Sequence, residues 1–335
     1  MLRMAVIGCG RIGRMHAANI AVHPRAKLAI VYDTDRASAE AVAAKHAVSV
    51  AKSAEAVFAS PDVDAILIAT ATDTHADYIE KAVAAEKPVL CEKPIDLSLE
   101  RVNRCAEAVG SKAVPIQIGF NRRFDPGHRA ARDAARSGEI GELHQVIITS
   151  RDPGMPPRSY YEKAGGLFRD MTIHDFDLAR FMLGEEPEEV FAIGGRLIDP
   201  SMMEELRDYD SAMVVMRTRS GKQCHINNSR ASTYGYDQRV ELLGSAGMVI
   251  SENRRAHEVR RYSAVHTEAA GPYLDFFIER YREAFDAEID AFVSCIENGE
   301  PPEVGFEDGR RALILAEAAM KSAADGRFVN VSEIG

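Results

Sequence analysis

The sequence predicts an α/β protein with two domains: a doubly wound parallel sheet, followed by an α+β domain on a large, mainly antiparallel open sheet. The chain has 335 residues, about twice the length of an average domain. Up to residue 122 short apolar runs alternate with alanine-rich helical stretches, and beyond it glycine dipeptides separate the runs. We therefore expect one domain over residues 1–122 and a second over residues 123–335.

The first half shows the alternation that is typical of parallel βαβ units. Its predicted strands are apolar throughout, as expected of a sheet that helices cover on both faces. These strands span residues 4–7, 28–32, 65–69, 89–91 and 114–118. Between them, apolar residues recur at helical spacing over residues 14–22, 37–45, 76–85 and 99–109.

The second half is predicted to place most of its strands before its longest helices. A helix over residues 128–136 precedes strands over residues 145–149, 190–193, 212–217, 223–227 and 239–243. Ser-Gly, Gly-Gly and Gly-Ser dipeptides separate several of these strands, which favours antiparallel pairing through tight turns. A helix over residues 167–183 interrupts the strands, and long helices over residues 275–297 and 308–323 close the chain.

The composition argues against several classes of partner. Lys and Arg number 41 and Asp and Glu 51, so the formal charge is −10 and the basic face that phosphate neutralisation requires is missing. No apolar run approaches the roughly 20 residues that span a bilayer. The five cysteines are scattered, and no CxxC or Cys/His pair has the spacing of a zinc site. We expect a reduced, cytoplasmic protein with no nucleic-acid partner, no membrane partner and no metal.

A glycine-rich loop follows the first predicted strand. Gly8-Cys9-Gly10-Arg11-Ile12-Gly13 has the pattern G-x-G-x-x-G at the start of a helix. The first glycine permits a tight turn, the second admits a pyrophosphate, and the third lets helix and strand pack closely. Free N–H groups at the helix start then face the phosphates. The pattern predicts a Rossmann domain in which Gly8, Gly10, Arg11, Ile12 and Gly13 bind a dinucleotide, although a turn used only for packing has similar glycines.

An acidic residue further along the chain indicates which dinucleotide the loop binds. Asp33 ends the second predicted strand 20 residues beyond Gly13, at the spacing expected of the carboxylate that binds the ribose diol. A carboxylate there would repel a 2′-phosphate, which favours NAD over NADP. Arg36 is the residue that could accommodate such a phosphate. We interpret Arg36 instead as a solvated residue in the first turn of the next helix.

Further candidates for cofactor binding follow the strand over residues 65–69. The carboxyl edge of an open α/β sheet is where ligands bind, and Thr70 and Thr72 could donate hydrogen bonds to cofactor oxygens there. Thr74 is expected to cap the next helix. His75 either contacts the cofactor or lies on the surface at the helix start.

Glu92-Lys93-Pro94 lies where the strand over residues 89–91 ends. Pro94 favours an extended backbone at Lys93, which would hold the lysine side chain over the cleft. A partly desolvated lysine has a lowered pKa and can exchange protons with a substrate hydroxyl. We assign Lys93 to catalysis and Glu92 to the cofactor site, although most lysines are solvated surface groups.

A second catalytic candidate is the pair Asp170 and His174. Their i, i+4 spacing places them on one face of a helix. A carboxylate that binds one imidazole nitrogen leaves the other nitrogen free to take a proton, so the histidine can act as a general base. A surface ion pair has the same spacing. His174 and Asp177 could share a metal ion, but the sequence offers no third ligand of suitable spacing, so we expect no metal.

Taken together, these motifs resemble the family of glucose-fructose oxidoreductases, inositol dehydrogenases and their MocA relatives. The glycine loop, Glu-Lys-Pro and Asp-x-x-x-His occur in the family's order over nearly the whole chain. Residues 119–125, 149–153 and 165–177 look most like the inositol 2-dehydrogenases. The resemblance implies a homotetramer that uses NAD to oxidise the C2 hydroxyl of myo-inositol to 2-keto-myo-inositol (scyllo-inosose).

The resemblance also implies which residues form the site: the catalytic set is Lys93, Asp170 and His174. The candidate contacts of an uncharged cyclitol or sugar substrate are Arg123, Asp152, Thr172 and Tyr234. Another cyclitol or sugar, such as scyllo-inositol, chiro-inositol or a glucose-type pyranose, is the main alternative substrate. A non-catalytic NAD(H)-responsive protein is a further alternative. The open sheet predicts a homo-oligomer that assembles through its uncovered face.

Overall fold

The computed structural model describes residues 1–110 and 112–335, which form two compact units. The first unit consists of Met1–Asn121 and Ala284–Leu313, and the second of Arg122–Glu283 and Ile314–Gly335. The predicted boundary at residue 122 lies where the chain first passes from one unit to the other. The C-terminal part differs from the prediction, since Ala284–Leu313 belongs to the first unit. The physical reason is apolar packing, because Ile289, Phe292 and Val293 lie in the first unit's core.

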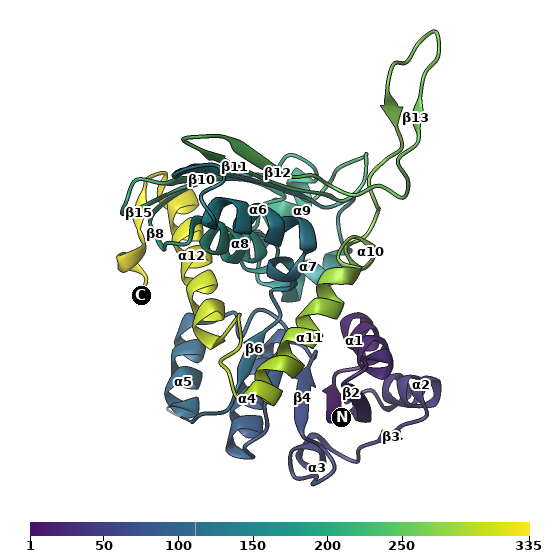
Figure 1. Cartoon of the computed structure of the whole chain (residues 1–335). Coiled ribbons are helices and arrows are strands. Elements are labelled where there is room, and N and C mark those ends of the chain that lie inside the picture. Colours follow the sequence, from purple (N-terminus) through teal and green to yellow (C-terminus); the bar gives the residue numbers. More distant parts are fainter. Residues whose placement is uncertain (111) are drawn as a thin grey trace. The chain divides into compact units, whose positions relative to one another are not determined.

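The first unit is built on six parallel strands in the order β3-β2-β1-β4-β5-β6 (Figure 1). They are β1 (Leu2–Ile7), β2 (Ala26–Tyr32), β3 (Ser49–Val50), β4 (Ala65–Ile68), β5 (Val89–Cys91) and β6 (Ile116–Ile118). The doubly wound sheet is therefore confirmed. The sequence analysis missed β3, because two residues are too few to show a period. The strand order reverses between β1 and β4, and ligands of open α/β sheets bind beside such a point.

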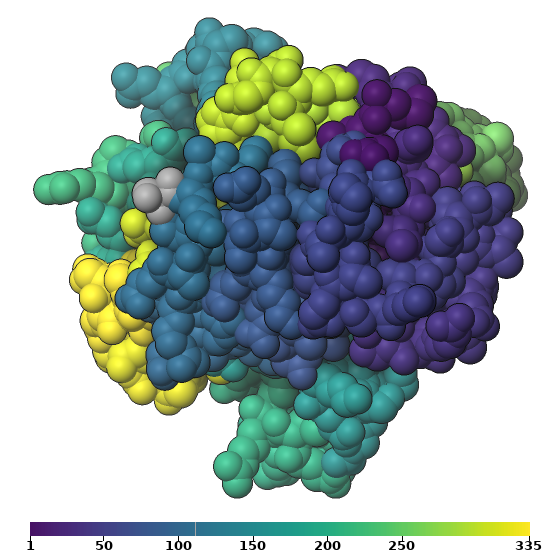
Figure 2. Space-filling model, turned by 90° about the horizontal axis from the view of Figure 1, so that it is seen from below, coloured from purple at the N-terminus to yellow at the C-terminus, as the bar shows by residue number. Residues whose placement is uncertain are grey.

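Several helices of the first unit begin with a side-chain cap. They are α1 (Arg11–Val22), α2 (Arg36–His46), α3 (Ala54–Phe58), α4 (His75–Ala84), α5 (Leu99–Val109) and most of α11 (Arg282–Asn298). The side chains of Asp35 and Ser98 accept N–H groups in the first turns of α2 and α5. Figure 2 shows the purple-to-blue residues of this unit as a closely packed surface.

The second unit is built on a seven-stranded sheet in the order β12-β11-β7-β10-β9-β8-β15. These strands are β7 (Leu143–Arg151), β8 (Pro187–Gly195), β9 (Ser211–Thr218), β10 (Gln223–Ser229), β11 (Asp237–Gly244), β12 (Met248–Ser251) and β15 (Val329–Asn330). Neighbouring strands are antiparallel except β7 and β10, which pair in parallel. The prediction of a mainly antiparallel sheet is confirmed.

Helices cover one face of this sheet (Figure 1). The unit contains α6 (Pro126–Arg136), α7 (Arg158–Ala164), α8 (Ile173–Leu183), α9 (Pro200–Glu205), α10 (Phe277–Arg280) and, from Ile314, α12 (Phe306–Asp325). The helix predicted over residues 167–183 starts instead as a π-helical turn, Phe168–Thr172, which precedes α8. The helix predicted over residues 275–297 is divided into α10 and α11.

The other face of the sheet carries apolar side chains that no helix covers. On β9, Ala212 and Val214 point into the core, whereas Met213 between them is 55% exposed. Ile193 on β8 is 59% exposed. A hairpin of β13 (Arg260–Arg261) and β14 (Ala269–Ala270) extends away from this sheet (Figure 1).

Across residues 1–110 and 112–335, no helix combines the length and apolar character needed to span a membrane.

Candidate functional site

The glycine loop connects β1 to α1, as predicted. Gly8 has a φ of +98°, and a Cβ there would lie 2.3 Å from the carbonyl oxygen of Ala69. A Cβ on Gly13 would lie 1.8 Å from the carbonyl oxygen of Gly8. Both positions therefore exclude a side chain. A Cβ on Gly10, by contrast, would meet nothing within 4 Å, so the backbone at the start of α1 faces open space. This arrangement fits a pyrophosphate at a helix N-terminus.

The other predicted loop residues lie beside it. Arg11 is exposed and Ile12 half-buried at the start of α1. Asp33 follows β2 and accepts the backbone N–H of Cys9 at 2.6 Å and that of Asp35 at 2.8 Å. The carboxylate thus also holds the glycine loop in place. Arg36 forms an exposed ion pair with Glu40 at 2.7 Å, as its interpretation as a solvated helix residue predicts.

The loop after β4 is held mainly by its own hydrogen bonds. The hydroxyls of Thr70 and Thr74 lie 2.7 Å apart, and Thr74 donates to the carbonyl of Ala71 instead of capping α4. Thr72 lies half-buried in the short 3-10 turn that precedes α4. The expected cap at Thr74 is wrong, because its hydroxyl closes the turn itself.

His75 is buried, which corrects the alternative that placed it on the surface. Its Nδ1 lies 2.8 Å from the carbonyl oxygen of Pro94 and its Nε2 3.1 Å from that of Thr70. Burial lowers the pKa of His75, so the ring is neutral at neutral pH. A neutral imidazole has one N–H and donates to one of these carbonyls at a time. His75 therefore joins the loop after β4 to the Glu92-Lys93-Pro94 segment.

Glu92 and Lys93 follow β5 at the carboxyl edge of the sheet, and both are partly buried. Glu92 Oε1 lies 2.8 Å from Nε2 of His16, a buried residue of α1. Lys93 thus lies between two residues that buried histidines hold, Glu92 through His16 and Pro94 through His75. The segment is fixed on both sides of the predicted catalytic lysine.

The charge of Glu92 acts on a second carboxyl group, that of Glu288. Glu288 of α11 has no exposed surface, and neither of its carboxylate oxygens has a hydrogen-bond partner. Burial raises the pKa of Glu288 well above its ordinary value of 4.5, and the charge of Glu92 adds to the effect. Both effects favour the protonated, neutral form of the Glu288 carboxyl group.

In the second unit, Asp170 lies in the π-helical turn and His174 in the first turn of α8. The hydroxyl of Tyr160 donates to Asp170 Oδ1 at 2.8 Å, and Arg230 Nη2 donates to Oδ2 at 2.7 Å. Arg230 Nη1 also donates to Asp152 Oδ2 at 3.1 Å. The predicted residues Asp152 and Asp170 are therefore joined through Arg230.

Two of the predicted substrate contacts are corrected. Thr172 has no exposed surface and its hydroxyl donates to Asn228 Oδ1 at 2.6 Å, so it supports the fold behind the site. Arg123 is buried and donates to both carboxylate oxygens of Asp177. A buried two-point ion pair with its own chain explains the presence of this arginine.

Tyr234 remains a candidate for substrate contact. It is 41% exposed, donates to Asp237 Oδ2 at 2.9 Å and accepts a hydrogen bond from Arg151 at 2.6 Å. Its ring also borders a small surface pocket with Arg239, Arg255 and Tyr273.

The sequence analysis missed Tyr160 and Arg230. Arg230 follows β10, and the parallel register of β10 with β7 brings it to Asp152, whose N–H donates to Ser229 at 2.9 Å. A polar run, Asn227-Asn228-Ser229-Arg230, marks this strand end in the sequence, but only the register shows which acid it meets. The predicted catalytic set is divided between the units, with Lys93 in the first and Asp170 and His174 in the second.

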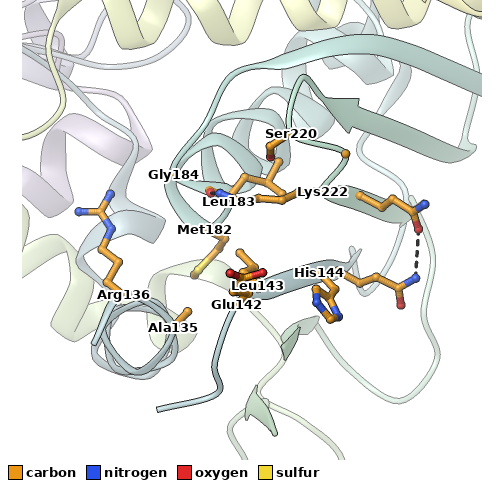
Figure 3. A pocket seen from close by; sticks show the side chains of 13 residues that line it. Ala135, Arg136, Glu142, Leu143, His144, Met182, Leu183, Gly184, Ser220 and Lys222 are labelled. Atoms are coloured by element: carbon orange, nitrogen blue, oxygen red, sulfur yellow. Dashed lines mark hydrogen bonds between the residues drawn. The ribbon is translucent and has the colours of Figure 1, made fainter. Parts of the chain in front are cut away.

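The described part of the chain shows no metal cluster, and a well-formed surface pocket lies away from the predicted site residues. Within residues 1–110 and 112–335, no group of three or more His, Cys, Asp or Glu side chains is placed to hold a metal ion. A surface pocket of about 850 Å³ in the second unit lies at the starts of β7 and β10 and the end of α8 (Figure 3). Its lining includes Arg136, His144 and Lys222 and contains none of the predicted site residues.

Comparison with known proteins identifies the family. Residues 2–120 match the oxidoreductase family with an NAD-binding Rossmann fold, and residues 128–250 match the GFO/IDH/MocA C-terminal domain. The chain belongs to the GFO/IDH/MocA oxidoreductase family. The predicted resemblance is thereby confirmed, and the first unit is the NAD-binding domain of this family.

Relatives of known structure and name extend the match over the whole chain. An inositol 2-dehydrogenase of Rhizobium meliloti (strain 1021) is 46% identical over 331 residues, which cover 99% of each chain. The crystal structure of a myo-inositol dehydrogenase from Corynebacterium glutamicum is 44% identical, covers 98% of each chain and has a TM-score of 0.96. A myo-inositol dehydrogenase from Lactobacillus casei in complex with NAD(H) and myo-inositol is 26% identical and covers 98% of this chain and 96% of its own, with a TM-score of 0.87.

Proposed function

We propose that this GFO/IDH/MocA oxidoreductase oxidises myo-inositol at C2 with NAD and releases 2-keto-myo-inositol (scyllo-inosose). The observation that carries the proposal is the full-length similarity to an inositol 2-dehydrogenase at 46% identity. The presence of Lys93, Asp170 and His174 together supports a catalytic protein over a silent NAD(H)-responsive one.

The first unit would hold the cofactor through its own backbone and one carboxylate. The open backbone at Gly10 would hold the pyrophosphate at the start of α1, and Asp33 would bind the ribose diol. The half-buried Thr70 and Thr72 and the segment that begins at Glu92 lie at the same carboxyl edge of the sheet. When bound, NAD supplies the acceptor for the hydride that leaves C2.

The chain's residues manage the proton of the C2 hydroxyl. Lys93 would hydrogen-bond the oxygen as it becomes a carbonyl, and His174 would take the proton. Asp170 would stabilise the imidazolium that results. Asp152 and Tyr234 would bind other hydroxyls of the ring. A cyclitol is uncharged, so the site must recognise it through hydrogen bonds to its hydroxyls. An analogue that lacks one hydroxyl binds more weakly, because it leaves a buried polar group of the site unpaired.

We also propose a homotetramer that assembles through the uncovered sheet face. Met213 and Ile193 on this face are more than half exposed, and apolar patches of this kind mark interfaces between proteins. Closed symmetry favours an interface that each copy forms with the same surface. We place the protein in the cytoplasm, which is supported by five free, buried cysteines.

A panel of cyclitols and sugars with NAD and NADP, followed by absorbance of the reduced cofactor, tests the function. We expect myo-inositol with NAD to give the highest kcat/KM. Lys93→Met and His174→Ala should each lower kcat by at least about a hundred-fold while NAD still binds. Preference for another cyclitol would shift the substrate assignment, and turnover with none of the panel would refute an oxidoreductase of this substrate class.

A further inference from the structure

One arginine of the second unit holds two acids of the candidate site. Arg230 is 3% exposed, and its Nη2 and Nη1 donate to Oδ2 of Asp170 at 2.7 Å and of Asp152 at 3.1 Å. The two acids are 18 residues apart in the sequence: Asp152 directly follows β7, and Asp170 lies in the π-helical turn before α8. A planar guanidinium can serve two carboxylates at once, because its N–H groups form a rigid fork.

Asp170 is held from a second direction. The hydroxyl of Tyr160, a residue of α7, donates to Oδ1 of Asp170 at 2.8 Å. Each carboxylate oxygen therefore accepts a hydrogen bond from a different side chain. The plane and position of the carboxylate are set by α7 and by the end of β10 together.

The charges in this cluster depend on Arg230. Burial raises the pKa of Asp152, the charge of Asp170 raises it further, and the guanidinium of Arg230 opposes both. Arg122 also acts on Asp152, and the ring of Tyr161 lies 5.4 Å from the Arg230 guanidinium carbon. Without Arg230, the buried carboxylate of Asp170 and the partly buried one of Asp152 would repel each other uncompensated, and such a pair takes up a proton.

We propose that Arg230 is a positioning residue for the dehydrogenase reaction: it keeps Asp170 ionised and oriented toward its role beside His174. The inference rests on the proposed function and deepens it. The proton that leaves the substrate hydroxyl then resides on His174, and Asp170 neither gains nor loses one. Asp170 acts as a fixed negative charge that its ion pair with Arg230 stabilises.

The test compares Arg230→Gln, Arg230→Lys and Tyr160→Phe with a matched control, Arg180→Gln. Arg180 is also a largely buried arginine between two acids, Asp177 and Glu186, but at the far end of α8. The kcat and KM of each variant for myo-inositol would be measured across pH, together with binding of NADH by fluorescence.

We expect Arg230→Gln to lose about a hundred-fold in kcat at neutral pH and to move the acidic limb of kcat/KM to higher pH by about one to three units. Arg230→Lys should shift the acidic limb less than Arg230→Gln, because lysine keeps the positive charge but lacks the forked N–H groups that reach both carboxylates. Tyr160→Phe should shift the limb less, in the same direction. Arg180→Gln should leave the limb in place, and NADH binding should be unchanged in all variants.

A measurement that needs no substrate, the titration of the aspartate carboxyl groups, tests this inference independently of the proposed function. NMR titration of protein labelled with ¹³C at the aspartate carboxyl groups follows each aspartate directly. In Arg230→Gln, one aspartate carboxyl should titrate at a higher pH, closer to neutral, than it does in the wild type. That result would stand even if no cyclitol were oxidised. An unshifted acidic limb in Arg230→Gln, or unchanged aspartate titrations, would overturn the proposal, whatever the loss in kcat. Should Arg230→Gln fail to fold, the shifts in Arg230→Lys and Tyr160→Phe decide it.

Discussion

Replacement of Glu288 by Gln should make the protein more stable at high pH. Glu288 is fully buried, neither carboxylate oxygen has a hydrogen-bond partner, and its pKa is raised well above 4.5. Between 4.5 and the raised pKa, the folded chain binds a proton that the unfolded chain has released. The free energy of unfolding therefore falls with rising pH, by about 1.4 kcal/mol per unit from this group alone.

The glutamine variant has no proton to lose at this position, so the pH-dependent contribution disappears. Over the pH range in which the carboxyl of Glu288 is protonated only in the folded chain, the variant should gain about 1.4 kcal/mol over the wild type for each pH unit. Denaturation by urea, followed by circular dichroism at a series of pH values, measures this difference.

Glu297→Gln on the same helix is the matched control, because Glu297 is half exposed and paired with Arg25. Its stability relative to the wild type should not rise with pH in this way. A stability difference between wild type and Glu288→Gln that stays constant from pH 5 to pH 7 would refute the reasoning.

Three further predictions concern the glycine loop, a buried ion pair and the open sheet. Gly13→Ala should abolish NADH binding by fluorescence or prevent folding, because its Cβ would lie 1.8 Å from the carbonyl oxygen of Gly8; unchanged binding would contradict the fit. Arg122→Met should lower the free energy of unfolding by about 3–5 kcal/mol in urea titrations, because Asp175 would remain as a buried, uncompensated charge. A loss below 1 kcal/mol would show that the pair contributes little. Met213→Asp should convert the proposed tetramer to smaller species in sedimentation, whereas the same change at exposed Lys45 on α2 of the first unit should not.

The glycine loop was predictable because its function is local. Gly8, Gly10 and Gly13 lie within a stretch of six residues, and the close approaches at Gly8 and Gly13 follow from their missing side chains. The apolar strands of the first unit were predictable for a similar reason, since burial on both faces leaves a continuous apolar run. The spacing to Asp33 added a contact that spans one βαβ unit.

Less of the second unit could be predicted from the sequence, because its contacts join segments that are far apart in the chain. Arg122 and Arg123 stand side by side in the sequence, yet each is paired with a different acid, Asp175 and Asp177, more than 50 residues away. Arg123 was predicted to bind substrate because its partner could not be known. The return of Ala284–Leu313 to the first unit was missed for the same reason, since its apolar pattern does not indicate which core it joins.

By itself, the sequence determined the family, the cofactor and the three residues expected to carry the reaction, because each is encoded in a short motif with local geometry. The tertiary structure decided what holds those residues. His16 and His75 anchor the segment that carries Lys93, and Tyr160 and Arg230 hold Asp170. These contacts come from the register of β7 with β10 and from the packing of α1 and α4, where electrostatics and burial act across long stretches of chain that no local pattern records.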